Sequence, residues 1–159
     1  MPERRLLGNR YVIDINIASI YLVENHPGYA YVSSLIDKTI YSGIRLIIFD
    51  FLPFRVFWIM TSKWDIPKYK AMESVLSLLE LPNIHLVSLN KEDILKAFDL
   101  SKNLKHDVYD ATYIVLAEKT KANGIITTDT DFEKLCNKVG LEYINPVPIH
   151  ILKKFERYR

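Results

Sequence analysis

Short runs of β-branched residues alternate with longer segments of helical periodicity, and this alternation constrains the fold more than any other feature. The apolar runs indicate buried strands over residues 11–15, 44–49, 84–89, 124–128 and 141–144. The periodic segments predict helices over residues 16–25, 29–42, 51–64, 68–80, 90–104, 107–122 and 131–139. Strands that alternate with helices form a parallel sheet covered on both faces. We therefore expect an α/β fold, a three-layer α/β/α sandwich around a five-stranded parallel sheet.

The composition fits one ordinary globular domain. Its 159 residues are enough for a single domain, residues 1–159, whose last part (146–159) forms a basic C-terminal tail or helix. The one cysteine, Cys136, lies at helical spacing among apolar residues, so we expect a small core residue rather than a nucleophile. No apolar run approaches the ~18 residues needed to span a bilayer, so we expect a cytoplasmic protein with no membrane partner.

Aspartates mark the places where predicted strands end and predicted helices begin. Asp14 ends the first strand, and Asp129 ends the fourth. Asp107 and Asp110 open the helix that leads into the fourth strand. A crossover helix runs antiparallel to its strands, so its start lies at the same edge of the sheet as the strand ends. We therefore expect these aspartates to converge on one rim of the sheet.

Each aspartate also has a simpler interpretation, as a helix cap that accepts a hydrogen bond from an orphan backbone N–H. Capping fits Asp107 best, Asp131 could simply start its helix, and Asp50 is placed to cap the helix after strand 44–49. Capping does not require three separate chain segments to bring carboxylates to one rim, however. Clustered carboxylates repel one another, and proteins usually offset this repulsion with a bound cation.

An all-oxygen ligand set favours Mg²⁺ or Mn²⁺ over zinc. The four histidines show no metal-ligand spacing, and only His106 lies near the predicted rim. A carboxylate-held Mg²⁺ on an open sheet edge suits phosphodiester hydrolysis, because the metal polarises a phosphoryl oxygen and lowers the pKa of its bound water. The net charge of +2 is too mild to indicate a nucleic-acid partner by itself.

Three motifs, in order along the chain, resemble those of the PIN domain family. They are "YVIDINIASIYL" (11–22), "HDVYDATYIVLAEK" (106–119) and "GIITTDTDF" (124–132), and the resemblance covers residues 11 to about 145. It implies a five-stranded parallel α/β/α sandwich and an endoribonuclease that depends on Mg²⁺ or Mn²⁺. The family includes the VapC-like toxins of toxin–antitoxin modules, so the resemblance also implies RNA as substrate, a possible antitoxin partner and a homodimer.

By position, the resemblance assigns catalytic and metal-binding roles to Asp14, Asp110 and Asp129. Asp131 matches an additional acid that some members carry, and we include it as a metal ligand. The supporting residues expected around these acids are Asn16 beside the first acid, Asp107, and the hydroxyl of Thr127 or Thr128, with Thr128 preferred.

One position departs from the family pattern. A glutamate usually follows the sequence Leu-Pro-aromatic in the helix after the second strand, but this chain has "LPFRV", with Arg55 in its place. A cation there would partly neutralise the acidic cluster and weaken a metal site. Asp50 is a nearby acid, although capping is its simpler interpretation. Arg55 therefore supports a second hypothesis, a catalytically impaired PIN domain that binds RNA or protein.

Two other folds that gather aspartates fit less well. A phospho-receiver domain needs an acidic pair after the first strand and a phosphoacceptor aspartate after the third, where this chain has Asp14 alone and Asn90. A haloacid-dehalogenase-like interpretation of "DTDF" fails because that motif belongs after the first strand.

Several surface features have two interpretations. Basic residues near the rim helix and in the tail could contact phosphates or could belong to solvated helix faces: Lys102, Lys105, Lys153 and Lys154. The apolar segment 51–60 is wide enough to indicate partial cover by another chain. The amphipathic segment 68–80 predicts one apolar face made by Met72, Val75, Leu76 and Leu79.

Overall fold

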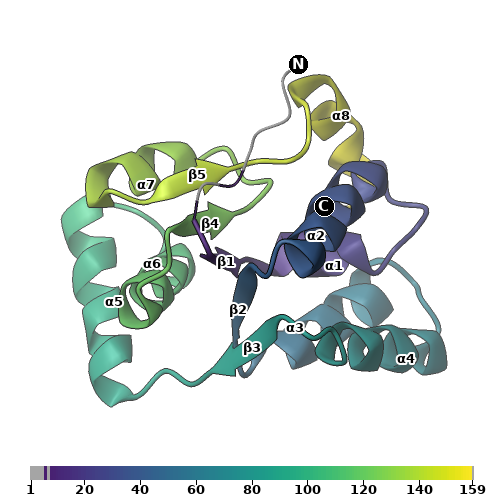
Figure 1. Ribbon diagram of the computed structural model, residues 1–159, viewed down its shortest axis with the longest axis horizontal. Coiled ribbons are helices and arrows are strands. Elements are labelled where there is room, and N and C mark those ends of the chain that lie inside the picture. Colours follow the sequence, from purple (N-terminus) through teal and green to yellow (C-terminus); the bar gives the residue numbers. More distant parts are fainter. Residues whose placement is uncertain (1–5, 7, 159) are drawn as a thin grey trace.

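A parallel sheet forms the centre of the computed structural model, which describes residues 6 and 8–158 apart from the side chain of residue 157. Five parallel strands lie in the order β3-β2-β1-β4-β5 (Figure 1). Their bounds are β1 Arg10–Ile13, β2 Arg45–Phe49, β3 Ile84–Val87, β4 Gly124–Ile126 and β5 Glu142–Ile144.

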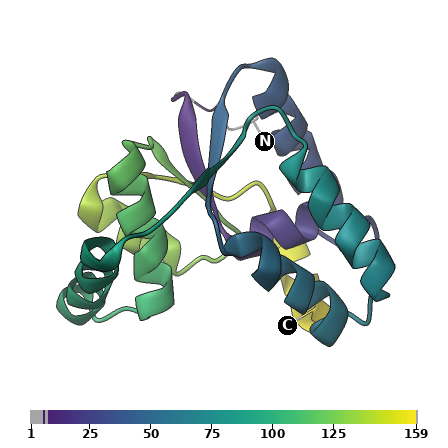
Figure 2. The same ribbon diagram turned by 90° about the horizontal axis from the view of Figure 1, so that it is seen from below.

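Helices cover both faces of this sheet, and Figure 2 shows the two helical layers on opposite sides of the strands. One layer contains α1 (Ile15–Tyr21), α2 (Tyr29–Tyr41), α3 (Leu52–Trp58) and α4 (Lys68–Leu79). The other contains α5 (Lys91–Leu104), α6 (Val108–Thr120) and α7 (Phe132–Val139). The predicted three-layer sandwich with a five-stranded parallel sheet is therefore confirmed.

The central strand β1 is buried on both sides, as a parallel strand between two helical layers must be. Val12 packs into the apolar cluster under α6 and α7, whereas Tyr11 and Ile13 pack into the cluster under α1 to α4. All three side chains are at most 1% exposed. This burial on both faces explains why the strand has a continuous apolar sequence.

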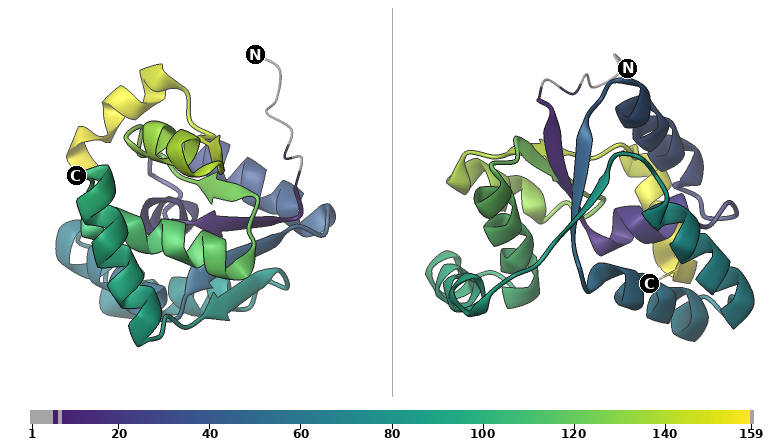
Figure 3. Two further views of the ribbon diagram at one scale, coloured as in Figure 1. Left: turned by 90° about the vertical axis from the view of Figure 1, so that its left-hand side faces the viewer. Right: turned by 60° about the horizontal axis from the view of Figure 1, so that its bottom comes forward.

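The chain ends beside the α1 layer. The short helix α8 (Ile149–Leu152) and the 3₁₀ turn η2 (Lys153–Tyr158) follow β5 and lie next to α1 in the views of Figures 1 and 3. The indole Nε1 of Trp64 donates a hydrogen bond of 2.9 Å to the carbonyl oxygen of Tyr158. Residue 159 and the side chain of residue 157, both part of the predicted basic tail, lie outside the described residues.

Two details of the predicted helices are corrected. The helix expected over residues 51–64 is α-helical only to Trp58 and continues as one π-helical turn, η1 (Ile59–Lys63). The predicted apolar face of α4 was partly wrong, because Met72 and Leu76 are 56% and 54% exposed. The buried stripe instead runs through Ala71, Val75 and Leu78, where the small alanine lets the helix approach its neighbours closely.

Two expectations from the composition can be compared with the structure. Cys136 is fully buried, and burial raises the pKa of its thiol to about 11, which confirms a core residue. Within the described residues, no helix combines the length and the apolar character that a membrane crossing requires.

Phe132 of the "GIITTDTDF" motif is a core residue, 1% exposed, whose ring lies 6.0 Å from that of Tyr113 and 6.1 Å from that of His106. We expect Phe132→Ala to lower the free energy of unfolding by roughly 3–5 kcal/mol, because it leaves a cavity beneath α7. The matched control is Phe98→Ala, whose side chain is 59% exposed and whose loss costs about 0.5 kcal/mol or less. Urea denaturation measures both, and equal losses would contradict this assignment.

Candidate active site

The site lies where the strand order reverses. β1 and β4 are neighbours in the sheet, but the chain leaves β1 toward α1 in one helical layer and leaves β4 toward α7 in the other. In open parallel sheets such a point creates a crevice at the carboxyl ends of the strands. Asp14 follows β1 directly, and Thr127, Thr128 and Asp129 follow β4.

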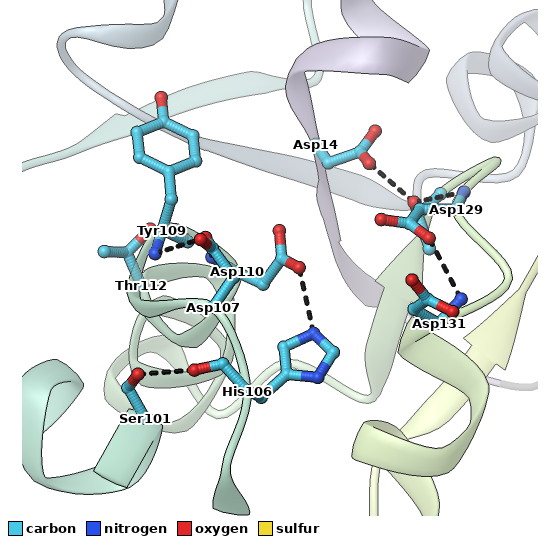
Figure 4. Close-up of polar contacts among 10 residues, drawn as sticks. Asp14, Ser101, His106, Asp107, Tyr109, Asp110, Thr112, Asp129 and Asp131 are labelled. Carbon is cyan, nitrogen blue, oxygen red and sulfur yellow. Dashed lines mark hydrogen bonds and ion pairs between the residues drawn. The ribbon is translucent and has the colours of Figure 1, made fainter.

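Asp14 is a helix cap and a member of the acidic cluster at the same time. Its side chain is 2% exposed, and Oδ1 accepts a hydrogen bond of 2.9 Å from the backbone N–H of Ile17 at the start of α1. Oδ2 accepts a hydrogen bond of 2.5 Å from the hydroxyl of Thr127 (Figure 4). The two interpretations considered for this aspartate therefore do not exclude each other.

Thr127 links Asp14 to Asp129. Its Oγ1 accepts a hydrogen bond of 3.0 Å from the backbone N–H of Asp129 while its hydroxyl proton goes to Asp14. The hydroxyl that contacts the acids is thus that of Thr127. Thr128 was the residue predicted for this supporting role, and the structure corrects that choice. Thr128 is the next residue, so its side chain leaves the chain in another direction and lines a neighbouring groove.

Asp110 reaches the same rim from the first turn of α6 and is held by a histidine. His106 Nε2 lies 2.9 Å from Asp110 Oδ2 (Figure 4). Asp107 is the N-cap of α6, and its Oδ1 accepts hydrogen bonds from the backbone N–H groups of Tyr109 (2.8 Å) and Asp110 (3.2 Å). The capping interpretation of Asp107 is therefore confirmed.

Asp129 and Asp131 lie on the loop between β4 and α7. Asp129 Oδ1 accepts a hydrogen bond of 2.9 Å from the backbone N–H of Asp131. The Asp131 side chain is exposed, and although this residue precedes α7, it makes no side-chain capping bond. Figure 4 shows the carboxylates of Asp14, Asp110 and Asp129 around one shared space, with Asp131 beside Asp129.

Burial and mutual repulsion raise the pKa values of two acids of the cluster. The pKa of Asp14 is raised from 3.8 to about 7, mainly by burial and in smaller part by the charges of Asp129 and Asp110, against the opposing hydrogen bonds from Thr127 and Ile17. Burial also raises the pKa of Asp110, as does the charge of Asp129, while the bond to His106 lowers it. A cation placed among these carboxylates would stabilise their ionised forms.

The cluster fits a hard metal ion by its chemistry, because every candidate ligand is a carboxylate oxygen. Within the described part of the chain, however, no three His, Cys, Asp or Glu side chains lie close enough together to hold one ion. Asp14, Asp110 and Asp129 therefore supply the right ligands in a spread arrangement. Their side chains would have to move closer together around an ion.

Arg55 lies at the edge of this site and faces an aromatic ring instead of the acids. Its guanidinium carbon is 4.6 Å from the ring centroid of Tyr109, a cation–π contact. Its Nε is buried without a hydrogen-bond partner, and among the described residues Arg55 forms no ion pair. Burial raises the pKa of Tyr109; the charge of Arg55 opposes this shift and that of Asp14 adds to it, so the ring lies within reach of both charges.

Two further expectations are corrected. Asp50 does not cap α3, because the cap position is Phe51, and Asp50 Oδ2 instead accepts a hydrogen bond of 2.7 Å from the Ser88 hydroxyl. Asn16 is exposed and makes no hydrogen bond to Asp14, since α1 turns its side chain away toward the neighbouring groove.

The predicted phosphate-binding lysines separate into two groups. Lys153 lines a groove together with Asp129, and Lys105 lines a second hollow together with His106 and Asp131. Lys102 and Lys154 line neither of these two depressions.

Two polar side chains beside the acids, His106 and Tyr113, were not predicted from the sequence as parts of the site. His106 stands four residues before Asp110, a spacing that could have indicated their contact. The hydroxyl of Tyr113, which accepts a hydrogen bond of 3.1 Å from the backbone N–H of Ile15 beside Asp14, gave no such signal.

The raised pKa of Asp14 predicts how stability depends on pH without metal. Between about pH 4 and pH 7 the folded protein holds a proton on Asp14 that the unfolded chain has lost, so the contribution of Asp14 to stability falls as pH rises, by up to about 1.4 kcal/mol per pH unit. His26, whose pKa burial lowers to about 4, contributes with the opposite sign over much of this range, so the Asp14 contribution is obtained as the difference between wild type and variant. Asp14→Asn should remove this contribution and make stability rise more steeply with pH, whereas Asp131→Asn, at an exposed position, should leave the pH dependence of wild type unchanged. Urea denaturation in EDTA across this range measures the slope, and an unchanged slope in Asp14→Asn would contradict the assignment.

Comparison with known proteins agrees with this geometry. Ten chains of solved structures match the fold. One belongs to the crystal structure of VapBC2 from Rickettsia felis bound to a DNA fragment from their promoter, with a TM-score of 0.64, 15% sequence identity, and coverage of 86% of this chain and 98% of that chain. No curated protein matches the sequence. The PIN domain model matches residues 11–138, a span that contains Asp14, Asp110 and Asp129, and the chain belongs to the PIN domain family.

Proposed function

We propose that this PIN domain is a metal-dependent endoribonuclease that hydrolyses RNA phosphodiesters with Mg²⁺ or Mn²⁺ at Asp14, Asp110 and Asp129. PIN domains generally use divalent metal ions. The observation that carries the proposal is that these carboxylates come from three separate chain segments to one rim of the sheet, where the charges of Asp129 and Asp110 add to the raised pKa of the buried Asp14. Such a cluster is costly without a cation, and all of its ligands are hard oxygen atoms.

The residues of the chain would prepare this site in complementary ways. A bound ion would polarise a phosphoryl oxygen and lower the pKa of its water. Thr127 fixes one oxygen of Asp14, and the start of α1 fixes the other. His106 holds Oδ2 of Asp110, which orients that carboxylate toward the shared space. Partners of this kind keep metal ligands in a defined orientation and raise the affinity of the site.

A role as the toxin of a toxin–antitoxin module is the biological form of this proposal. The Rickettsia felis neighbour is a VapBC complex on promoter DNA, which supports an antitoxin partner for this chain as well. Phe51, Phe54 and Trp58, which are 59%, 67% and 51% exposed, form part of an apolar surface that another chain could cover. We propose an antitoxin and a second copy of the chain as its partners, in the cytoplasm.

The role of the rim acids as metal ligands can be tested by comparing their variants with a variant of Asp107, the aspartate that caps α6. Asp110→Asn and Asp129→Asn should each reduce cleavage of single-stranded RNA in Mn²⁺ by at least about 100-fold, because each removes a metal ligand. The matched control is Asp107→Asn, which keeps the α6 cap because asparagine caps equally well, and it should stay within about threefold of wild type. EDTA should abolish the activity and added Mn²⁺ should restore it. Equal loss in Asp107→Asn would refute the assignment of ligands.

A catalytically impaired domain that binds RNA or protein remains the second candidate, because Arg55 replaces the usual acid. The contact of Arg55 with Tyr109 favours the active enzyme, since the guanidinium does not pair with the carboxylates. Arg55→Gln and Arg55→Glu should therefore change the cleavage rate by less than about tenfold, which corresponds to about 1.4 kcal/mol. A larger gain in Arg55→Glu alone, measured in the same assay, would favour the impaired binding module.

A further inference from the structure

A groove of about 570 Å³ lies directly beside the acidic cluster. Most of the residues that line this groove have no part in the acidic cluster. We call it the C-terminal groove, because η2 and α8 form one of its walls. Asn16, Thr128 and Asp129 line the part that belongs to the candidate active site. Lys63 and Lys153 also line it. Its volume falls in the range of small-molecule sites and is sufficient for one nucleotide.

The C-terminal groove is held open by contacts between distant parts of the chain. Trp64 donates to the carbonyl of Tyr158 (2.9 Å), and the Tyr158 hydroxyl donates to the carbonyl of Asn25 (3.2 Å). The ring of His26 lies 5.4 Å from that of Trp64, 4.5 Å from that of Phe155 and 4.4 Å from that of Tyr158. Figures 1 and 3 show η2 and α8 (yellow) against the α1 layer. A site with fixed walls binds its ligand at a lower entropic cost.

The π-helical turn η1 also contributes to the lining of the groove. Ile59 and Lys63, its first and last residues, both line the groove. A π-helical turn widens the helix at one place and is frequent at functional sites. The ammonium of Lys63 lies 5.7 Å from the ring centroid of Trp58, a cation–π contact. This irregular turn thus brings a second lysine, besides Lys153, to the lining of the groove.

The two lysines are available to a ligand. Both are exposed, and within the described part of the chain neither forms an ion pair. Among the described residues, the one acid that lines the groove is Asp129, a candidate metal ligand. His26 does not add a third cation at neutral pH, because burial lowers its pKa to about 4. The described lining of the groove therefore offers two cations next to the acidic rim.

The remaining lining is largely apolar and includes Ile20, Ile59 and Leu152. A nucleobase packs well against such a surface, while lysines neutralise the phosphates on either side of it. The bases of a duplex are paired with each other and are not available to fill a groove of this size. A protein segment that entered with arginines or lysines would meet like charges. These features favour single-stranded RNA over duplex and over a basic peptide.

We propose that the C-terminal groove binds one nucleotide of single-stranded RNA next to the phosphodiester at the acidic rim, with Lys63 and Lys153 on its phosphates. This inference rests on the proposed function, since it makes the groove a substrate subsite of the same active site. The base packs against the apolar part of the lining, which includes Ile59 and Leu152. The groove thereby fixes which phosphodiester faces the carboxylates.

The test measures RNA binding without cleavage. A short fluorescein-labelled single-stranded RNA is titrated with protein in EDTA, and fluorescence anisotropy gives the Kd at several salt concentrations. The variant Lys63→Ala/Lys153→Ala should weaken binding by about tenfold and reduce the slope of log K against log salt by about 1.4, which is 0.7 for each lost phosphate contact. The matched control is Lys70→Ala/Lys154→Ala, which loses the same charge at exposed lysines that do not line the groove, and it should stay within about twofold.

The outcomes separate this inference from the proposed function. If RNA binding weakens equally in both double variants, or in neither, the groove is not an RNA subsite. A protein segment would then be its expected ligand. Selective loss in the groove variant without any Mn²⁺-dependent cleavage by wild type would support the subsite and sink the nuclease. Cleavage in Mn²⁺ that both double variants retain at the wild-type rate would support the nuclease and sink the subsite. Thermal melting verifies folding, and Lys153→Glu replaces the double variant should the latter unfold.

Discussion

The site depends on one buried carboxylate that is held from two sides. Asp14 is 2% exposed, and an ionised group at such a position is costly unless it is hydrogen-bonded or paired. One oxygen accepts from the first turn of α1, and the other accepts from Thr127 after β4. Asp14 therefore ties the end of β1, the start of α1 and the end of β4 together. The remaining acids can gather around it only because these elements are fixed in that way.

This dependence explains why the rim could be predicted from the sequence. Strand and helix periodicity give the order of elements, and a parallel sheet brings all strand ends to one edge. Asp14, Asp110 and Asp129 follow from that topology without any knowledge of side-chain contacts. The PIN domain motifs contain the same residues, so topology and resemblance point to one place in the fold.

Contacts between side chains from different segments could not be predicted in the same way. Asp50 has the sequence position of a cap, but Ser88 at the end of the neighbouring β3 offers its carboxylate a closer donor. Thr127 and Thr128 are equivalent in sequence, and only the direction in which each leaves β4 decides which one meets Asp14. In α4 the bulkier apolar residues predict the buried face only in part. The small Ala71 lies on the buried face, because it lets the helix pack closely against its neighbours.

Lys153 and Lys154 are a further case in which the sequence does not predict side-chain position and the fold determines it. They are adjacent, equally charged and both exposed, so no pattern in the chain distinguishes them. The turn η2 places Lys153 in the groove beside Asp129 and leaves Lys154 outside it. The position of η2 depends on the contacts of Trp64 and His26 with Tyr158 and Phe155, far from the acids in sequence. The carboxylates can therefore come from the sheet topology alone, whereas the surface that positions a substrate over them requires the packing of the C-terminal segment.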